Sequence, residues 1–215
     1  MLKRFLYLLI SLSLFLCYSC KKDGDETLEG DPSELVDDSH VKVDSRYGIT
    51  AICPTGEWTN QYNDTCPEAS RDYYKDYLFN RVTLAYKGDS TVSSSGSVSF
   101  PTAIYLMRFH YIPTSQADAE NFMKGYKETC FDAFEDYYYV QDSISDFETT
   151  SLNGYEAKYF TAKMGVYVAS GTQEIYLMYE NGRVYGVDLS YLDSLSTEAG
   201  IENARSVMKT ISIVQ

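Results

Sequence analysis

Residues 173–190 read Gln-Glu-Ile-Tyr-Leu-Met-Tyr-Glu-Asn-Gly-Arg-Val-Tyr-Gly-Val-Asp-Leu-Ser, the strongest signal for a β-hairpin in the chain. Two apolar runs flank Asn181-Gly182, a dipeptide that favours the two-residue type I′ turn of a β-hairpin. Counting outward from the turn pairs Ile175 with Asp188. Both faces of the hairpin are largely apolar, so we expect both faces of its sheet to be covered.

Further strands are predicted before this hairpin. Residues 103–112 alternate in the manner of a central strand, and the serine-rich segment 90–99 is predicted to be a mobile loop. A second Asn-Gly pair, at residues 153 and 154, predicts another tight turn. The remaining predicted strands are residues 81–87, 141–151 and 155–163.

Two helices are predicted to lie on this sheet. The first begins near Ser115, and its apolar residues recur every four positions from Phe122 to Phe134. The second begins after Ser196 or Thr197, either of which can cap its first turn. No long Pro/Gly/Ser linker divides residues 46–215, so we expect a single α+β domain.

The first 19 residues have the character of an export signal. A basic start is followed by a short apolar run that ends at Cys17-Tyr18-Ser19-Cys20. This arrangement resembles a bacterial lipoprotein signal, which implies cleavage before Cys20 and attachment of acyl chains such as palmitate to that residue. Such chains would hold the protein on a membrane. The alternative is ordinary secretion, with Cys20 merely near the cleavage site.

Residues 20–45 are predicted to be a flexible acidic tether, because they contain too few large apolar residues to form a core. Lysines followed by acidic residues directly after Cys20 also resemble the surface-export signal of Bacteroidota lipoproteins. A merely solvated linker is an equally good explanation. We therefore expect a lipid anchor in the bacterial outer membrane, on the periplasmic or the cell-surface face.

Composition disfavours several classes of function. The chain has 18 basic and 31 acidic residues and a formal charge of −13, which argues against binding nucleic acid. It has two histidines, and no sequence motif for a phosphate loop, a zinc site or a catalytic serine is present. Acidic clusters such as Asp142, Asp146 and Glu148 lack the spacing of a calcium loop. We expect no metal and no cofactor.

Three cysteines, Cys53, Cys66 and Cys130, fall in the predicted domain. In an oxidising compartment one disulfide and one free thiol are expected, and three pairings are possible. We favour Cys53 with Cys66, because both lie in one loop-rich region beside a proline. Cys130 lies on the apolar stripe of the first predicted helix, so we expect a buried thiol there.

The chain resembles a known superfamily in its order of elements. A strand runs into Pro54-Thr55-Gly56-Glu57-Trp58, and a helix, Asn-Gly hairpins, a Gly-Arg-Val-Tyr-Gly strand and a final helix follow. Over roughly residues 47–214 this order is similar to the PsbP-like superfamily, which includes many bacterial lipoproteins. The resemblance implies an antiparallel sheet sandwiched between helices, and a binding or assembly role rather than catalysis.

Tyrosine is unusually frequent, with 21 residues, and residues 137–139 are consecutive tyrosines. Tyrosine suits contact with proteins or sugars, so Trp58, Tyr137 and Tyr139 form the candidate ligand surface. The alternative is a structural role at the edges of the sheet.

Three Asp-Ser pairs followed by a threonine or an apolar residue resemble the O-glycosylation signal of exported Bacteroidota proteins. The candidate serines are Ser90, Ser143 and Ser194. The alternative is that these pairs merely form turns.

Three functional hypotheses follow. The first is a non-enzymatic, lipid-anchored binding or assembly module with a protein partner. The second is a surface protein that binds glycans. The third is a hydrolase whose site is built around Arg108 and His110, which share a strand face and would be joined by Asp188. A satisfied polar patch under a loop is the preferred explanation of these residues.

Overall fold

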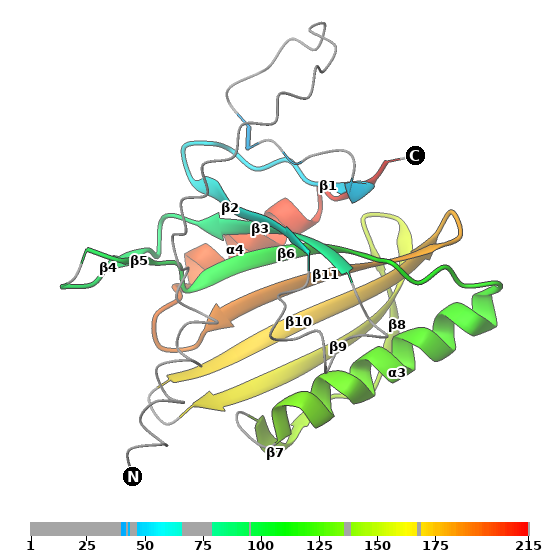
Figure 1. The fold of residues 1–215 in the computed structure, drawn as a ribbon. Coiled ribbons are helices and arrows are strands. Elements are labelled where there is room, and N and C mark those ends of the chain that lie inside the picture. Colours follow the sequence, from blue (N-terminus) through cyan, green and yellow to red (C-terminus); the bar gives the residue numbers. More distant parts are fainter. Residues whose placement is uncertain are drawn as a thin grey trace, which may run out of the picture.

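The computed structural model describes residues 40–41, 43, 47–65, 79–94, 96–135, 139–166 and 169–214, with the side chains of 61–65, 79, 129–135, 139–143, 164–166 and 169 excepted. Its main feature is an antiparallel sheet (Figure 1). In spatial order the strands are β2 (Trp58–Thr65), β3 (Phe79–Tyr86), β6 (Thr102–Phe109), β11 (Arg183–Leu192), β10 (Ala169–Glu180), β9 (Tyr155–Val166) and β7 (Tyr139–Ile144), and β8 (Glu148–Leu152) also pairs with β9.

The predicted central hairpin is confirmed with its register. Strands β10 and β11 pair Ile175 with Asp188, as counted from the turn. Asn181 and Gly182 both have positive φ, at 51° and 75°, as a type I′ turn requires. Asn153 and Gly154 have the same property and join β8 to β9.

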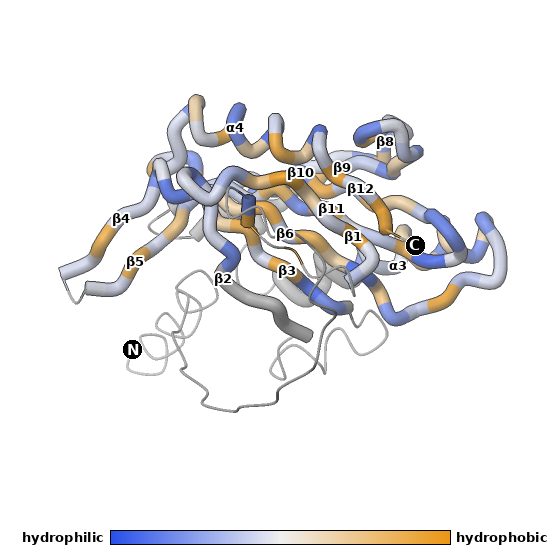
Figure 2. The backbone as a smooth tube through the Cα atoms, turned by 90° about the horizontal axis from the view of Figure 1, so that it is seen from above, coloured by the Kyte–Doolittle hydropathy of each residue, from blue (hydrophilic) through white to orange (hydrophobic). Residues whose placement is uncertain are grey.

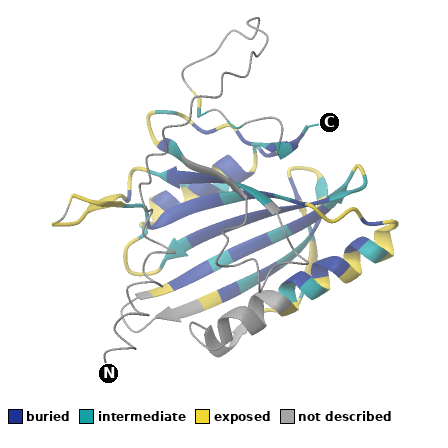
Figure 3. Cartoon of the chain, in the orientation of Figure 1, coloured by how far each residue is buried: buried dark blue, intermediate teal, exposed yellow. Residues whose placement is uncertain are grey.

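Among the described residues, one helix packs on each face of the sheet. Helix α4 (Glu198–Met208) packs on a core that includes Leu106 and Val187, while α3 (Gln116–Glu135) packs on a core that includes Phe109 and Phe160. Side chains alternate along a strand, so these two sets of residues lie on opposite faces. Buried and hydrophobic residues are concentrated in the central strands between the helices (Figures 2 and 3). The chain is therefore an α+β protein, as predicted.

The predicted cap of the second helix is confirmed. The Thr197 side chain accepts a hydrogen bond from the Gly200 amide at 3.0 Å. The carboxylate of Asp89, from the loop after β3, accepts further bonds from the Thr197 amide and hydroxyl and from Thr102. A Cβ on Gly200 would lie 2.1 Å from this carboxylate, so only glycine fits there.

The first and last described strands pair with each other. β1 (Ile49–Thr50) and β12 (Ser212–Ile213) form a separate two-stranded sheet over the α4 face. This sheet places the C-terminal strand beside the start of the domain.

Two predictions about local structure were wrong. The predicted strand 141–151 is divided into β7 and β8, which pair with different halves of the 12-residue strand β9. The predicted loop 90–99 contains a small hairpin of β4 (Thr91–Val92) and β5 (Val98–Ser99). These strands are only two residues long and lie among serines, so the sequence shows no alternation of apolar and polar residues that would predict them.

Candidate functional site

Trp58 is a core residue and does not belong to a ligand surface, which corrects the prediction. Its side chain is 1% exposed, and its ring packs against Tyr86 with 5.3 Å between centroids. The indole Nε1–H donates to Asn203 Oδ1 at 2.9 Å. The start of β2 thus lies beneath α4, so the only tryptophan of the chain fixes the final helix.

Several other predicted residues lie outside the described parts of the chain. These are Cys20, Cys66 and Tyr137. Tyr139 and Ser143 lie in β7 and Cys130 lies in α3, but their side chains are not among those described.

Two of the candidate glycosylation sites are exposed. Ser194 lies in a turn between β11 and α4. Ser90 follows β3, and its hydroxyl donates to the Lys87 carbonyl at 2.7 Å. Modification at either serine stays a prediction.

Cys53 is a free thiol with no exposed surface. Burial raises its pKa to about 12, so it remains protonated at neutral pH. The favoured disulfide with Cys66 is therefore not formed in this structure, where Cys53 is enclosed in the α4-side core. Pairing of Cys53 with Cys66 in an oxidising compartment stays a prediction.

Arg108, His110 and Asp188 do not form one pocket. Arg108 lies opposite Tyr185 and Asp188 lies opposite Tyr105, so the alternation of side chains along β6 and β11 places them on opposite faces. His110 follows the end of β6, is exposed, and has its Nε2 atom 2.8 Å from Asn80 Oδ1. The arrangement on which the hydrolase hypothesis rested is therefore absent.

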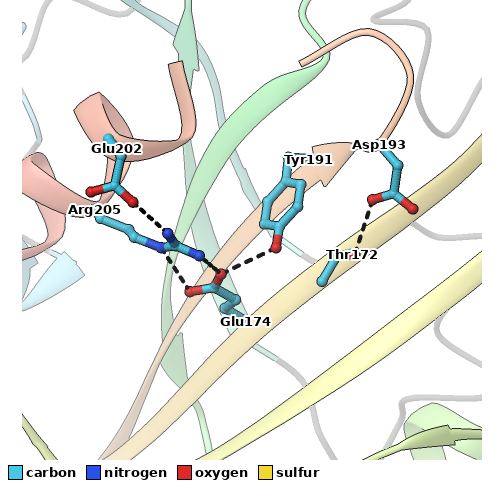
Figure 4. A network of polar contacts seen from close by, with 6 residues as sticks. All are labelled: Thr172, Glu174, Tyr191, Asp193, Glu202 and Arg205. Atoms are coloured by element: carbon cyan, nitrogen blue, oxygen red, sulfur yellow. Dashed lines mark hydrogen bonds and ion pairs between the residues drawn. The ribbon is translucent and has the colours of Figure 1, made fainter. Parts of the chain in front are cut away.

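The structure instead gathers three tyrosines around an ion pair beside α4. We call this set, made of Tyr159, Glu174, Tyr176, Tyr191 and Arg205, the tyrosine–arginine surface. Glu174 on β10 is 6% exposed, while the three tyrosines are half-buried. Figure 4 shows Arg205 reaching from α4 to Glu174, with Tyr191 approaching the same carboxylate from β11.

The contacts of Glu174 are short and numerous. Arg205 Nη2 lies 2.6 Å from its Oε1 atom, and Arg205 Nε donates to Oε2 at 3.5 Å. The Tyr191 hydroxyl donates to Oε1 at 3.2 Å. Arg205 also pairs with Glu202 at 2.5 Å on the solvent side. The buried carboxylate is thus satisfied, and the pair fastens α4 to the sheet.

The tyrosine hydroxyls remain protonated at neutral pH. Burial, and then the negative charge of Glu174, raise the pKa of Tyr159 to about 12 and also raise the pKa values of Tyr176 and Tyr191. Hydrogen bonds to Glu174 raise the pKa of Arg205, so its guanidinium stays charged. The rings of Tyr159 and Tyr176 lie 4.7 Å apart with planes tilted by 39°. The surface therefore presents hydroxyl donors, aromatic rings and one fixed cation.

Sequence reasoning missed this surface because its residues come from three strands and a helix. The hairpin register already placed Glu174 and Tyr176 on one face, two residues apart on β10. Tyr159 joins them only through the pairing of β9 with β10, where it lies opposite Tyr176. The consecutive tyrosines at 137–139 are the stronger compositional signal, and they favour a ligand surface that includes Tyr137 and Tyr139 instead.

A pocket of about 370 Å³ lies on the other face, between α3 and the sheet. Lys158 on β9 lies 3.8 Å from Glu120 on α3 and donates to the Thr149 hydroxyl at 3.0 Å. Within the part of the chain that the structure describes, no group of three His, Cys, Asp or Glu side chains is placed to hold a metal ion. None of the helices formed by these residues is long and apolar enough to cross a membrane.

Comparison with known proteins adds little to this description. No family model matches the chain, and no curated protein matches it. A crystal structure from Bacteroides thetaiotaomicron VPI-5482 is 10% identical and superposes with a TM-score of 0.45. The match covers 78% of this chain and 45% of that one, so this chain spans less than half of its length.

Proposed function

We propose that this protein is a non-enzymatic binding or assembly module of the bacterial envelope, anchored in the outer membrane by a lipid on Cys20. The observation that carries the binding role is the tyrosine–arginine surface beside α4. Tyrosine and arginine are the residue types that, with tryptophan, contribute most to protein–protein interfaces. We therefore expect the partner to be a protein.

Preorganisation supports this role. Arg205 is held by Glu174 and Glu202, so its guanidinium loses little freedom when a partner binds. Its side chain is nevertheless 42% exposed and accessible to a partner. An antiparallel sheet with one helix on each face also agrees with the PsbP-like resemblance, and membership of that superfamily is part of the proposal.

A crosslinking pull-down from native envelopes tests the surface. We expect Tyr176→Ala to lose a protein that the wild-type lipidated chain recovers. Tyr179→Ala is a matched control, because Tyr179 is also half-buried and lies on β10, but on the opposite face. Recovery of the same proteins with both variants, each shown to be folded by circular dichroism, would contradict the proposed surface.

The anchor has its own test. Mass spectrometry of the membrane-extracted protein should find an acylated Cys20, and Cys20→Ala should move the protein to the soluble fraction. An unmodified N-terminus at Lys21 or earlier would contradict the anchor and leave the binding surface untouched.

Glycan capture is the second candidate function. The observation that favours it is a pair of buried polar atoms, on Thr83 and Asp188, that have no hydrogen-bond partner among the described residues. Both lie on the α3 side of the sheet, away from the tyrosine–arginine surface.

A further inference from the structure

A row of polar residues crosses the α3 side of the sheet. Thr83 on β3 lies opposite Tyr105 on β6, and Tyr105 lies opposite Asp188 on β11. The same row continues to Ile175 and Phe160, which belong to the core beneath α3. The row thus changes from apolar to polar across the sheet, beyond the residues that pack against α3.

Two members of this row have buried polar atoms with no hydrogen-bond partner among the residues that the structure describes. Asp188 is 7% exposed; its Oδ2 atom accepts a hydrogen bond from Gln173 at 2.9 Å, but Oδ1 has no hydrogen-bond partner among the described residues. Thr83 is 6% exposed, and its Oγ1 atom has no hydrogen-bond partner there either. Buried polar atoms without partners destabilise a fold, so two on one face require an explanation.

The neighbouring row is made of small residues. Ala85, Ala103 and Ser190 lie side by side on β3, β6 and β11 and are all buried. On the other face the same three strands carry the larger Leu84, Ile104 and Leu189. Short side chains therefore border Thr83 and Asp188 on this face, where the opposite face carries large ones. The surrounding Arg81, Tyr105 and Gln173 are only half-buried, so this region is open to solvent at its margin.

The charges in this region offset each other. The Arg81 guanidinium carbon lies 5.1 Å from the centre of the Tyr105 ring. Burial raises the pKa of Asp188 to about 7, while the positive charge of Arg81 and the hydrogen bond from Gln173 act in the opposite direction, and the nearby Glu174 raises it further. A cationic ligand would be repelled by Arg81 and an anionic ligand by Asp188. The balance favours a neutral ligand.

We propose that Thr83 and Asp188, together with the small residues beside them, form a binding site for a neutral saccharide. A carboxylate oxygen accepts hydrogen bonds and a threonine hydroxyl can donate or accept, so ligand hydroxyl groups complement both. Strands β3 and β11 are separated by β6, which places their backbones about 9–10 Å apart. A ligand that reaches both residues is therefore at least as large as a single sugar ring. This inference deepens the second candidate function and is independent of the protein-partner surface.

The test is a glycan array of bacterial and host mono- and oligosaccharides, probed with the chain from residue 21 onward and followed by calorimetry on each hit. We expect at least one neutral saccharide to bind, and Thr83→Val and Asp188→Asn each to weaken it about tenfold or more. Thr161→Val is the matched control, because Thr161 is a half-buried strand residue on the opposite face. It should bind like the wild type.

Stability measurements separate a binding role from a structural one. Thr83→Val removes a buried hydroxyl that has no partner in the described part of the chain, so we expect an unchanged or higher melting temperature together with lost binding. A silent array for the wild-type chain would overturn the saccharide site, as would hits unaffected by both variants. Hits lost in Tyr176→Ala but kept in Asp188→Asn would also overturn it and would assign sugar binding to the tyrosine–arginine surface. None of these results bears on a protein partner recovered by crosslinking.

Discussion

Replacing Arg205 with methionine is the most direct perturbation of the tyrosine–arginine surface. The substitution leaves the Glu174 carboxylate at 6% exposure with the Tyr191 hydroxyl but without its cation. Breaking a fully buried ion pair costs about 3–5 kcal/mol. The Arg205 side chain is 42% exposed, so water can reach part of the carboxylate, and we expect a smaller loss of about 2 kcal/mol. For a domain of this size that corresponds to a melting temperature about 4–8 °C lower.

Urea and thermal unfolding, followed by circular dichroism, measure this loss. Glu202→Gln is the control, because the Glu202 side chain is 61% exposed and its pair with Arg205 should contribute less than about 0.5 kcal/mol. The double variant Glu174→Gln/Arg205→Met should recover part of the loss, since no buried charge is then left without a cation. An equal loss of stability in Arg205→Met and Glu202→Gln would show that the Glu174 carboxylate does not depend on Arg205. A double variant less stable than Arg205→Met alone would show the same.

Three further predictions concern single buried groups. Burial raises the pKa of Asp188 from 3.8 to about 7, so the folded state binds the carboxyl proton more tightly than the unfolded chain does. The stability that results is fully present below pH 4 and is lost as the pH rises through 7. Urea midpoints should show wild type losing stability relative to Asp188→Asn between pH 4 and 8, and a constant difference would contradict this. Cys53 should resist iodoacetamide in the folded protein and react after denaturation; labelling of the native protein would show that the core around it opens. Asn203→Leu removes the acceptor of the Trp58 indole and should cost about 1–2 kcal/mol, measured through the fluorescence of this single tryptophan, and an unchanged midpoint would argue against the bond.

The local parts of the fold could be predicted from the sequence. Asn181-Gly182 imposes a turn with positive φ at both residues, and that turn fixes the register of every pair counted outward from it. Thr197 as a helix cap was similarly predictable, because the hydroxyl acts on an amide only three residues away. In both cases neighbouring residues supply the whole interaction.

The candidate sites depend on the order of strands, which local patterns do not specify. Tyr159 and Tyr191 approach Glu174 only because β9 and β11 flank β10. The alternation of residues 103–112 correctly predicts a strand. A contact between Arg108 and Asp188 depends on the register of β6 against β11, and that register places the two side chains on opposite faces. Trp58 was misassigned for the same reason, because its partner Asn203 is 145 positions away.

The closing contacts of the domain have a consequence for the order in which it folds. Asp89 accepts hydrogen bonds from Thr197, the cap of α4, which lies 108 positions later, and β1 pairs with a strand at the other end of the domain. These contacts cannot form until Thr197 and β12 have been synthesised, so the domain cannot be completed from its N-terminus onward.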